Sequence, residues 1–207
     1  AGLGIPGITA HRALHVAGPV AGRTVLVQGG GGAVGHCAVT LARLAGATVI
    51  ATVRSEPDRT IAERAGAHYV VLTGGDSPVA LAERVRAIAP DGVQHIVEVA
   101  FAENLALDEL LLSSGGSVAA YATNHPRAEF PFWPLVFKNV RIDFLGSDDF
   151  PGEFKAEAAR DLNRALSGGW SGFEIDRRFP LEAIADAHEW MEERKGKGRV
   201  VLDLGSL

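Results

Sequence analysis

The sequence predicts an α/β protein with a doubly wound parallel sheet. Short, β-branched apolar runs alternate with segments whose apolar residues recur every three or four positions, and one run passes through a cluster of glycines directly into a helix. Buried strands that alternate with amphipathic helices predict a parallel sheet covered on both faces. Ligands of such sheets bind beyond the carboxyl ends of the strands, so the residues that follow each strand are the candidate functional residues.

The glycine cluster lies in residues 24–46, where the apolar run 25–27 is followed by the spacing Gly30-x-Gly32-x-x-Gly35 and then by a helical pattern. We expect Gly30 to permit a tight turn, Gly32 to let the backbone approach a ligand, and Gly35 to let the helix pack against the strand. Strand, glycines and helix in this order begin a Rossmann fold and predict a pyrophosphate at the helix N-terminus. The alternative is a flexible turn between two core elements.

The other elements follow in chain order. Further strands are expected at residues 48–53, 66–72, 94–99, 116–121, 140–145 and 199–204. Helices are expected at residues 8–17, 58–65, 79–88, 104–112, 151–166 and 180–194, with Ser77 as a helix cap and an irregular, aromatic-rich link at 130–137. No internal repeat interrupts this alternation.

Composition and charge narrow the class of protein. A hydrophobic content of 47% is ordinary for one sizeable core, and a net charge of −5 with dispersed basic residues requires no nucleic-acid partner. Cys37 is the only cysteine, so the chain can form neither an intrachain disulfide nor a thiolate zinc site, and a buried thiol is expected. With no apolar run of ~18 residues and no signal peptide, we expect a cytoplasmic protein without a membrane partner. The apolar start without methionine suggests a fragment.

The residues after the second strand favour NADP(H) over NAD(H). A 2′-phosphate needs cationic and hydroxyl donors where an NAD site has an acid. Arg54 can form a bidentate pair with phosphate, Ser55 adds a hydroxyl, and Arg59 lies one helical turn further on. Glu56 and Asp58 bring negative charge to the same place and count against this interpretation. The alternative is that both arginines are solvated surface charges.

Five stretches, with their order and spacing, carry a resemblance to a known family: residues 7–14, 25–35, 65–68, 110–118, and 179–188 together with 196–202. In these the chain resembles the zeta-crystallin-type quinone oxidoreductases, a zinc-independent group of the medium-chain dehydrogenase/reductase superfamily. Two positions depart from the family pattern. His11 replaces an aromatic residue, and Asp58 replaces a basic residue that often helps to hold the 2′-phosphate.

The resemblance implies a two-domain enzyme that works as a homodimer. Residues 1–167 would be its NADP-binding Rossmann domain, and residues 168–207 would return toward a GroES-like N-terminal domain to which little of this chain corresponds. The relatives are expected to dimerise through the edge strand 140–146, where Val140, Ile142 and Phe144 alternate. The alternative is an edge covered by the helix that begins at Pro151.

The resemblance also implies the cofactor contacts, which all fall where the residue patterns place a ligand. They are Gly31, Gly32, Ala33 and Val34 at the pyrophosphate; Arg54 and Ser55 at the adenosine phosphate; Thr73 at the adenine; Asn104 at the middle of the cofactor; Tyr121, Ala122, Thr123 and Asn124 beside the nicotinamide; and Leu145, Gly146 and Ser147 closing over it. Asn104 has an alternative role as a helix cap, and Tyr121 as a core aromatic residue.

The sequence offers no arrangement of acid, base or nucleophile, so the catalytic residues stay unknown. It contains neither a Tyr-x-x-x-Lys pair nor a Gly-x-Ser-x-Gly nucleophile elbow, and the seven histidines are scattered. This absence suits chemistry in which the cofactor carries the hydride. We therefore expect an NADPH:quinone oxidoreductase whose electron acceptor is a quinone or another conjugated carbonyl or alkene. The alternatives are a non-catalytic dinucleotide-binding module, or a zinc alcohol dehydrogenase if residues upstream supply metal ligands.

Overall fold

The computed structural model describes residues 2–193 and 198–205 and contains a six-stranded parallel sheet. In spatial order β3-β2-β1-β4-β5-β6, the strands are β3 (Tyr69–Leu72), β2 (Thr48–Val53), β1 (Thr24–Val27), β4 (Val93–Glu98), β5 (Leu112–Ala120) and β6 (Arg141–Phe144). From β1 the chain first adds β2 and β3 on one side and then crosses over to add β4, β5 and β6 on the other. Doubly wound folds bind dinucleotides at this switch between β1 and β4. The predicted fold class is confirmed.

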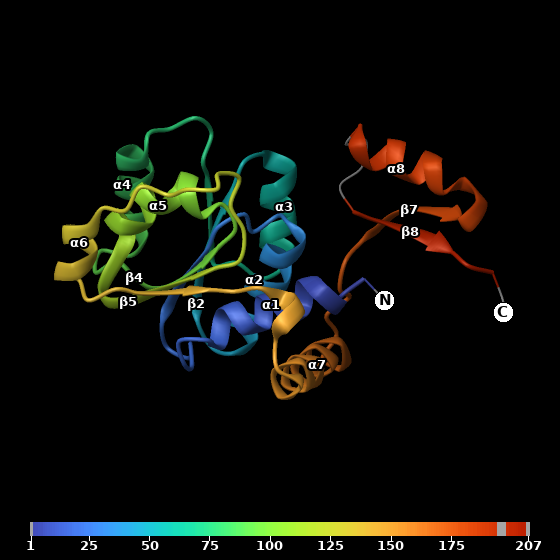
Figure 1. Ribbon diagram of the computed structural model, residues 1–207, viewed down its shortest axis with the longest axis horizontal. Helices are drawn as coiled ribbons and strands as arrows, with labels where there is room; N and C mark the ends of the chain where they lie inside the picture. The colour runs from blue at the N-terminus through green and yellow to red at the C-terminus, as the bar shows by residue number, and fades with distance from the viewer. Residues whose placement is uncertain (1, 194–197, 206–207) are drawn as a thin grey trace.

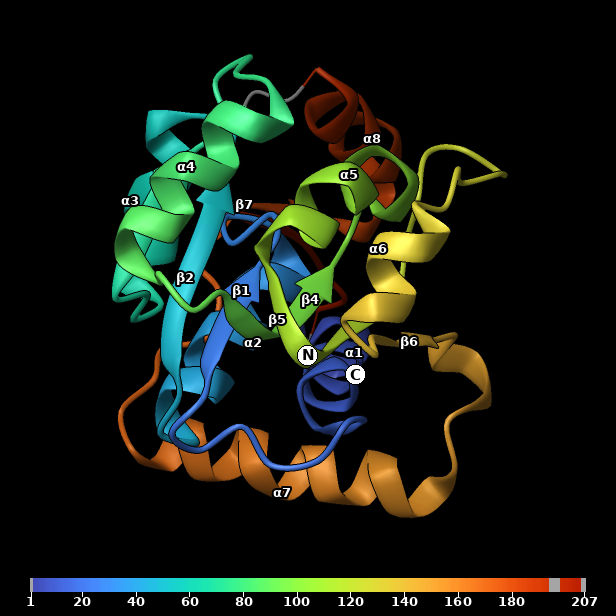
Figure 2. The ribbon, with the colours of Figure 1, turned by 90° about the vertical axis from the view of Figure 1, so that its left-hand side faces the viewer.

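Helices cover both faces of this sheet (Figures 1 and 2). They are α1 (Gly4–His15), α2 (Ala33–Leu44), α3 (Glu56–Arg64), α4 (Pro78–Ile88), α5 (Phe101–Leu111), α6 (Phe132–Phe137) and α7 (Gly152–Ser167). Helices α1, α2 and α7 pack on one face, and α4 and α5 pack together on the other. Within residues 2–193 and 198–205, no helix has both the length and the apolar character needed to cross a membrane.

The core forms two apolar layers because strand side chains alternate between the faces of the sheet. Val25 and Val27 belong to the layer under α1 and α2, whereas Leu26 between them belongs to the layer under α4 and α5. All three are fully buried, as is Cys37 on α2, which confirms the expected buried thiol. Burying each large apolar side chain contributes about 1.5–3 kcal/mol, so the central strand that leads to the glycines is held rigidly from both sides.

Several predicted element boundaries need correction. β5 begins at Leu112 rather than at residue 116, and the link at 130–137, expected to be irregular, contains the short helix α6. Ser77 caps α4 as expected, since its Oγ accepts the N–H of Ala80 at 3.3 Å. α5 begins at Phe101, which places Asn104 inside the helix, so the alternative role of Asn104 as a helix cap is wrong.

The C-terminal part forms a second, smaller sheet, visible beside the main sheet in Figure 1. β7 (Ile175–Pro180) pairs in parallel with β8 (Arg199–Asp203), and α8 (Ile184–Glu192) packs on both. The helix expected at 180–194 is therefore too long at its start, and β7 was not predicted. Four of the six β7 residues are charged or proline, and only Phe179 is buried, so the strand lacks the apolar run that signals one.

Candidate functional site

The tight turn of the glycine loop is made at Gly29, not at Gly30 as expected. The backbone of Gly29 has φ +71°, a left-handed conformation that favours glycine, whereas Gly30 has no positive φ. Gly30 is instead required by close packing, because a Cβ there would lie 2.7 Å from the Cβ of Ala51 on β2. The loop therefore presses against the neighbouring strand as it leaves β1.

The next glycines bring α2 close to the loop and leave its first turn open. A Cβ on Gly35 would lie 2.1 Å from the carbonyl oxygen of Gly29, so the helix packs on the loop backbone as expected. Gly32 is the N-cap of α2, and it has no side chain with which to cap the helix. The N–H groups of the first turn have no partner within a helix. This helix end is therefore shaped to receive an anion.

A cavity of about 250 Å³ opens at this helix end, between the glycine loop and the C-terminal segment. Its lining comes from the loop, from α2 and α3, and from residues 170–174 and 198–199: Gly31, Gly32, Ala33, His36, Ile61, Arg64, Trp170, Ser171, Gly172, Phe173, Glu174, Gly198 and Arg199. Three predicted pyrophosphate contacts thus share one cavity with two arginines. The sequence analysis missed Arg64 and Arg199, although Arg199 lies in one of the stretches that carry the resemblance.

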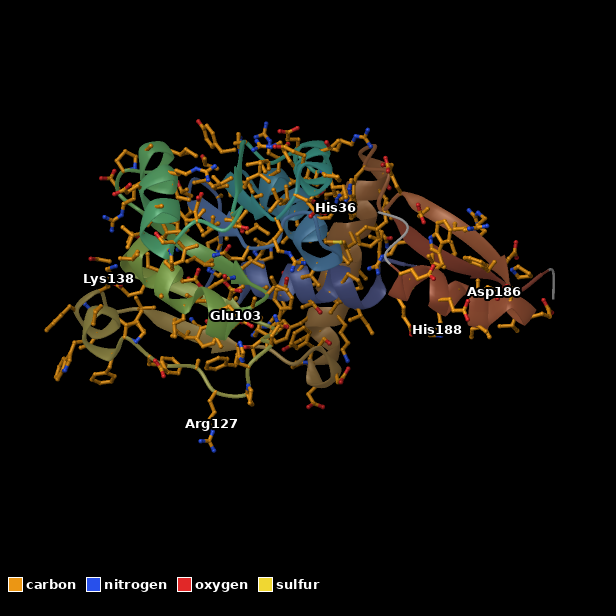
Figure 3. All side chains as sticks on the ribbon, turned by 90° about the horizontal axis from the view of Figure 1, so that it is seen from above. His36, Glu103, Arg127, Lys138, Asp186 and His188 are labelled. Atoms are coloured by element: carbon orange, nitrogen blue, oxygen red, sulfur yellow. The ribbon has the colours of Figure 1, made fainter. Side chains whose placement is uncertain are left out.

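Aromatic side chains tie the C-terminal wall of the cavity to α2. Trp170 stacks on His36 with ring centroids 5.7 Å apart, and its Nε1 donates to His36 Nε2 at 3.3 Å. Burial lowers the pKa of His36, which favours the neutral ring that accepts this bond. The guanidinium of Arg199 lies 4.4 Å from the ring centroid of Phe173. Figure 3 places His36 on the side of the main sheet that faces β7 and β8.

The residues predicted to hold the 2′-phosphate follow β2 and begin α3. Arg54 is exposed. Ser55 is the N-cap of α3: its Oγ donates to Asp58 Oδ2 at 2.5 Å and accepts the Asp58 N–H at 3.4 Å. Arg59 contacts Glu56 at 2.9 Å and donates to a backbone carbonyl of β3. Arg54 is thus the basic side chain best placed for a phosphate, and the hydroxyl of Ser55 would have to leave Asp58.

Asn104, which the sequence predicts at the middle of the cofactor, is held by a buried acid. Its Nδ2 donates to both carboxylate oxygens of Glu98, at 3.0 and 3.2 Å. Glu98 is the last residue of β4 and is fully buried, and it also accepts the backbone N–H of Ala100. Burial raises the pKa of Glu98, and these hydrogen bonds partly oppose that shift.

A second buried acid completes a polar network below the glycine loop. Asp108 on α5 is fully buried and accepts a bond from Gln28 Nε2 at 2.9 Å, while Thr52 Oγ1 donates to Gln28 Oε1 at 2.5 Å. Burial, followed by the charge of Glu98, raises the pKa of Asp108 well above its usual range. Burial and the neighbouring carboxylate therefore favour the protonated form of Asp108. Asp108 stands four residues after Asn104, among leucines that are buried on the same helix, and this pattern was the sequence signal for the network.

The remaining predicted contacts lie at the same edge of the sheet but outside the cavity lining. They follow the ends of β3, β5 and β6: Thr73, Tyr121, Ala122, Thr123, Asn124, Leu145, Gly146 and Ser147. Val34 and Asn104 are also absent from the lining, so the cofactor roles of all these residues stay predictions. Tyr121 is half-buried, and burial raises the pKa of its phenol, which keeps it neutral.

Comparisons with known proteins agree with this architecture. The family described as zinc-binding dehydrogenase matches residues 33–162. The quinone oxidoreductase of Mus musculus is 33% identical over 207 residues, which cover 98% of this chain and 61% of that protein. The structure of a mycobacterial quinone oxidoreductase superposes with a TM-score of 0.87 at 28% identity, covering 95% of this chain and 61% of that one.

A second mycobacterial structure, solved in complex with NADPH, superposes with a TM-score of 0.80 at 29% identity and covers 95% of this chain and 61% of that one. The chain thus spans 61% of the length of each of these relatives. The family match extends over more than half of the chain and includes α2, all the later strands of the main sheet and most of α7. The chain therefore belongs to the zinc-binding dehydrogenase family, within the medium-chain dehydrogenase/reductase superfamily.

Proposed function

We propose that this chain is the NADP(H)-binding part of an oxidoreductase that transfers hydride from NADPH to a quinone or another conjugated carbonyl or alkene. One observation carries the proposal: the open N-terminus of α2 lines a cavity that also contains Arg199 and Arg64, of which Arg64 pairs with Glu174 at 2.6 Å. Backbone N–H groups and guanidinium groups are donors for a pyrophosphate. The similarity to quinone oxidoreductases, and the NADPH bound in a similar mycobacterial structure, support the choice of cofactor and reaction.

The residues present fit such a cofactor. The loop presents Gly31 and Gly32 to the cavity, and the exposed Arg54 stands at the end of β2, where a 2′-phosphate is read. Gly31 is also required by packing, because a Cβ there would lie 2.6 Å from the Cβ of Asp58. Bound NADPH would supply the hydride itself. The part of this chain would be to hold the pyrophosphate, to orient the nicotinamide beyond β5 and β6, and to exclude water from the site.

We propose that the reaction needs no zinc from this chain. Its single cysteine, Cys37, is fully buried, and burial raises the pKa of the thiol to about 12, so the chain supplies no thiolate ligand near the glycine loop. A conjugated acceptor suits a reaction without zinc, because the hydride goes to carbon and the product can take its proton from water.

The domain division at residues 167 and 168 is also proposed, since α7 ends at Ser167 and β7 and β8 form their own sheet.

We propose further that two copies pair through β6, the edge strand of the main sheet. Phe144 is 67% exposed on this strand, and further exposed aromatic residues lie just before α6 and on it: Phe130, Phe132, Trp133 and Phe137. An exposed apolar edge favours pairing with a second strand. A cytoplasmic location stays a prediction.

The function is tested by adding NADPH and a quinone to the complete protein and following NADPH oxidation. Quinone-dependent oxidation that survives thorough metal chelation supports the proposal. Binding of NADPH without turnover would favour a non-catalytic module, and activity that chelation abolishes would favour a zinc alcohol dehydrogenase. Both of these results would contradict the proposed reaction while leaving the cofactor assignment in place.

A further inference from the structure

We propose that His11, His15 and Asp161 form a binding site for a divalent transition-metal ion of the Zn²⁺ class, which links α1 to α7. Each residue offers one donor atom, and the three donor atoms lie within 4.8 Å of one another. His11 Nε2 and Asp161 Oδ2 are 3.1 Å apart, and the two imidazole ring centroids are 4.7 Å apart. None of the three lines the cavity beside the glycine loop, so the site is separate from the proposed cofactor site.

The two helices present these donors through their own geometry. His11 and His15 are four residues apart on α1, so their side chains lie on the same helix face, one turn apart. α7 packs against α1 and brings Asp161 to this face. Glu157, one turn before Asp161 on α7, is a second carboxylate that acts electrostatically on His15. Two imidazoles thus meet the carboxylate of Asp161 at the helix–helix contact.

Without a metal, His11 Nε2 and Asp161 Oδ2 share a hydrogen bond of 3.1 Å. Imidazole nitrogen and carboxylate oxygen bind Zn²⁺ at about 2.0–2.2 Å, so two ligands of a tetrahedral ion lie about 3.3 Å apart. An ion could therefore replace the shared proton with little movement of these two side chains. The half-buried ring of His15 must turn toward the other two donors, because the three donor atoms are spread over up to 4.8 Å.

The surroundings already orient two of the ligands. The side chain of His11 is only 4% exposed, so its ring is fixed by packing. Asp161 uses its second oxygen, Oδ1, to accept a bond from Arg164 at 2.8 Å, which holds the carboxylate while Oδ2 faces His11. Such outer contacts fix the orientation of ligands in metal sites. The neighbouring Arg12 lies over the ring of Phe154, 3.9 Å from its centroid.

The test has two titrations of the metal-free chain. ZnCl₂ is added and the heat of binding is measured by isothermal titration calorimetry, and CoCl₂ is added in a second titration followed by visible absorption. We expect one ion per chain and a higher unfolding temperature with Zn²⁺, because an ion bound only to the folded state stabilises it. His15→Ala and Asp161→Asn should each weaken binding at least about tenfold, the lower end of the loss seen for residues that merely support ligands. His188→Ala is the matched control, since His188 is exposed on α8 (Figure 3), which lies apart from α1 and α7 (Figure 1).

Unchanged affinity in both ligand variants, or no saturable binding by the unmodified chain, would overturn the proposal. The Co²⁺ spectrum provides a measurement that needs no variant. Intense bands of a four-coordinate ion would support the site, whereas the weak spectrum of hydrated Co²⁺ would contradict it. NADPH binding should be the same with and without the metal, so the result is independent of the proposed enzymatic function.

Discussion

Single residues decide whether the end of β1 can hold an anion. Gly29 supplies the left-handed turn, Gly30 allows contact with β2, and Gly35 allows contact with the loop. The spacing of the glycines predicted a nucleotide loop but assigned the turn to the wrong residue. Four consecutive glycines, from 29 to 32, give no sequence signal that distinguishes the one with positive φ.

Gly35→Ala should destabilise the protein without placing any group in the cavity. The new Cβ would lie 2.1 Å from the carbonyl oxygen of Gly29, so the loop or the helix must move. We expect a loss of about 1–3 kcal/mol in the free energy of unfolding, as for other overpacked core sites. Gly152→Ala is the control, because a Cβ there has no neighbour within 4 Å. Denaturant unfolding of both variants measures the difference, and equal stability would show that the contact is not tight.

Arg54→Ala should weaken the binding of NADPH and leave the binding of NADH nearly unchanged. A hydrogen bond to a charged group contributes about 1.5–3 kcal/mol, which corresponds to a loss of roughly tenfold or more in affinity. Arg160→Ala on the exposed side of α7 serves as the control. Fluorescence titration with both cofactors gives the comparison. An equal loss for NADH and NADPH would exclude Arg54 from the 2′-phosphate site.

Asp108→Asn should reduce the loss of stability that accompanies rising pH. Because the pKa of Asp108 is raised in the folded chain, only the folded state keeps this proton above the usual aspartate pKa of about 4. Stability then falls as pH rises toward the raised pKa. The Asn variant has no proton to lose, and its amide oxygen can still accept the bond from Gln28. Urea unfolding at acidic and neutral pH measures how the free energy of unfolding changes with pH, and Asp91→Asn serves as an exposed control. The same change with pH in both variants would refute the prediction.

At the scale of elements, local patterns were sufficient for the main sheet and insufficient for the C-terminal part. β1 and α2 were predictable because an apolar strand, glycines and a helical repeat stand side by side in the sequence. β7 was not predictable because pairing with β8, rather than burial, holds it in place. Arg64 and Arg199 were missed for a related reason. Their convergence on the glycine loop depends on contacts between distant parts of the chain.

Ile142→Pro should shift a dimer toward monomer with little effect on the fold. Leu145 donates its N–H to Ala120 on β5, and since N–H groups alternate along a strand, that of Ile142 points to the open edge. Proline removes this outward donor and spares the bonds to β5. Light scattering at matched concentrations measures the shift. A monomeric unmodified chain, or an unchanged dimer for a folded variant, would argue against pairing through β6.

At the scale of the whole molecule, the candidate site is formed where two parts of the chain meet. The main sheet presents the glycine loop, and the segment between α7 and β7 supplies Trp170 and the opposite wall. The sequence could place each strand end at one edge of a sheet, because parallel strands share a direction. It could not show that the residues after α7 fold back over α2, since no local pattern encodes that contact.

The most direct test of the central claim is a titration of the chain with NADPH, followed by tryptophan fluorescence. Of the three tryptophans, Trp170 lines the cavity, so binding there should change the emission. We expect a saturable change that Gly32→Val abolishes in a folded protein, because its side chain occupies the space of the pyrophosphate and closes on the carbonyl of Gly29. An unmodified chain that does not bind NADPH, or a folded Gly32→Val variant with unchanged affinity, would contradict the account.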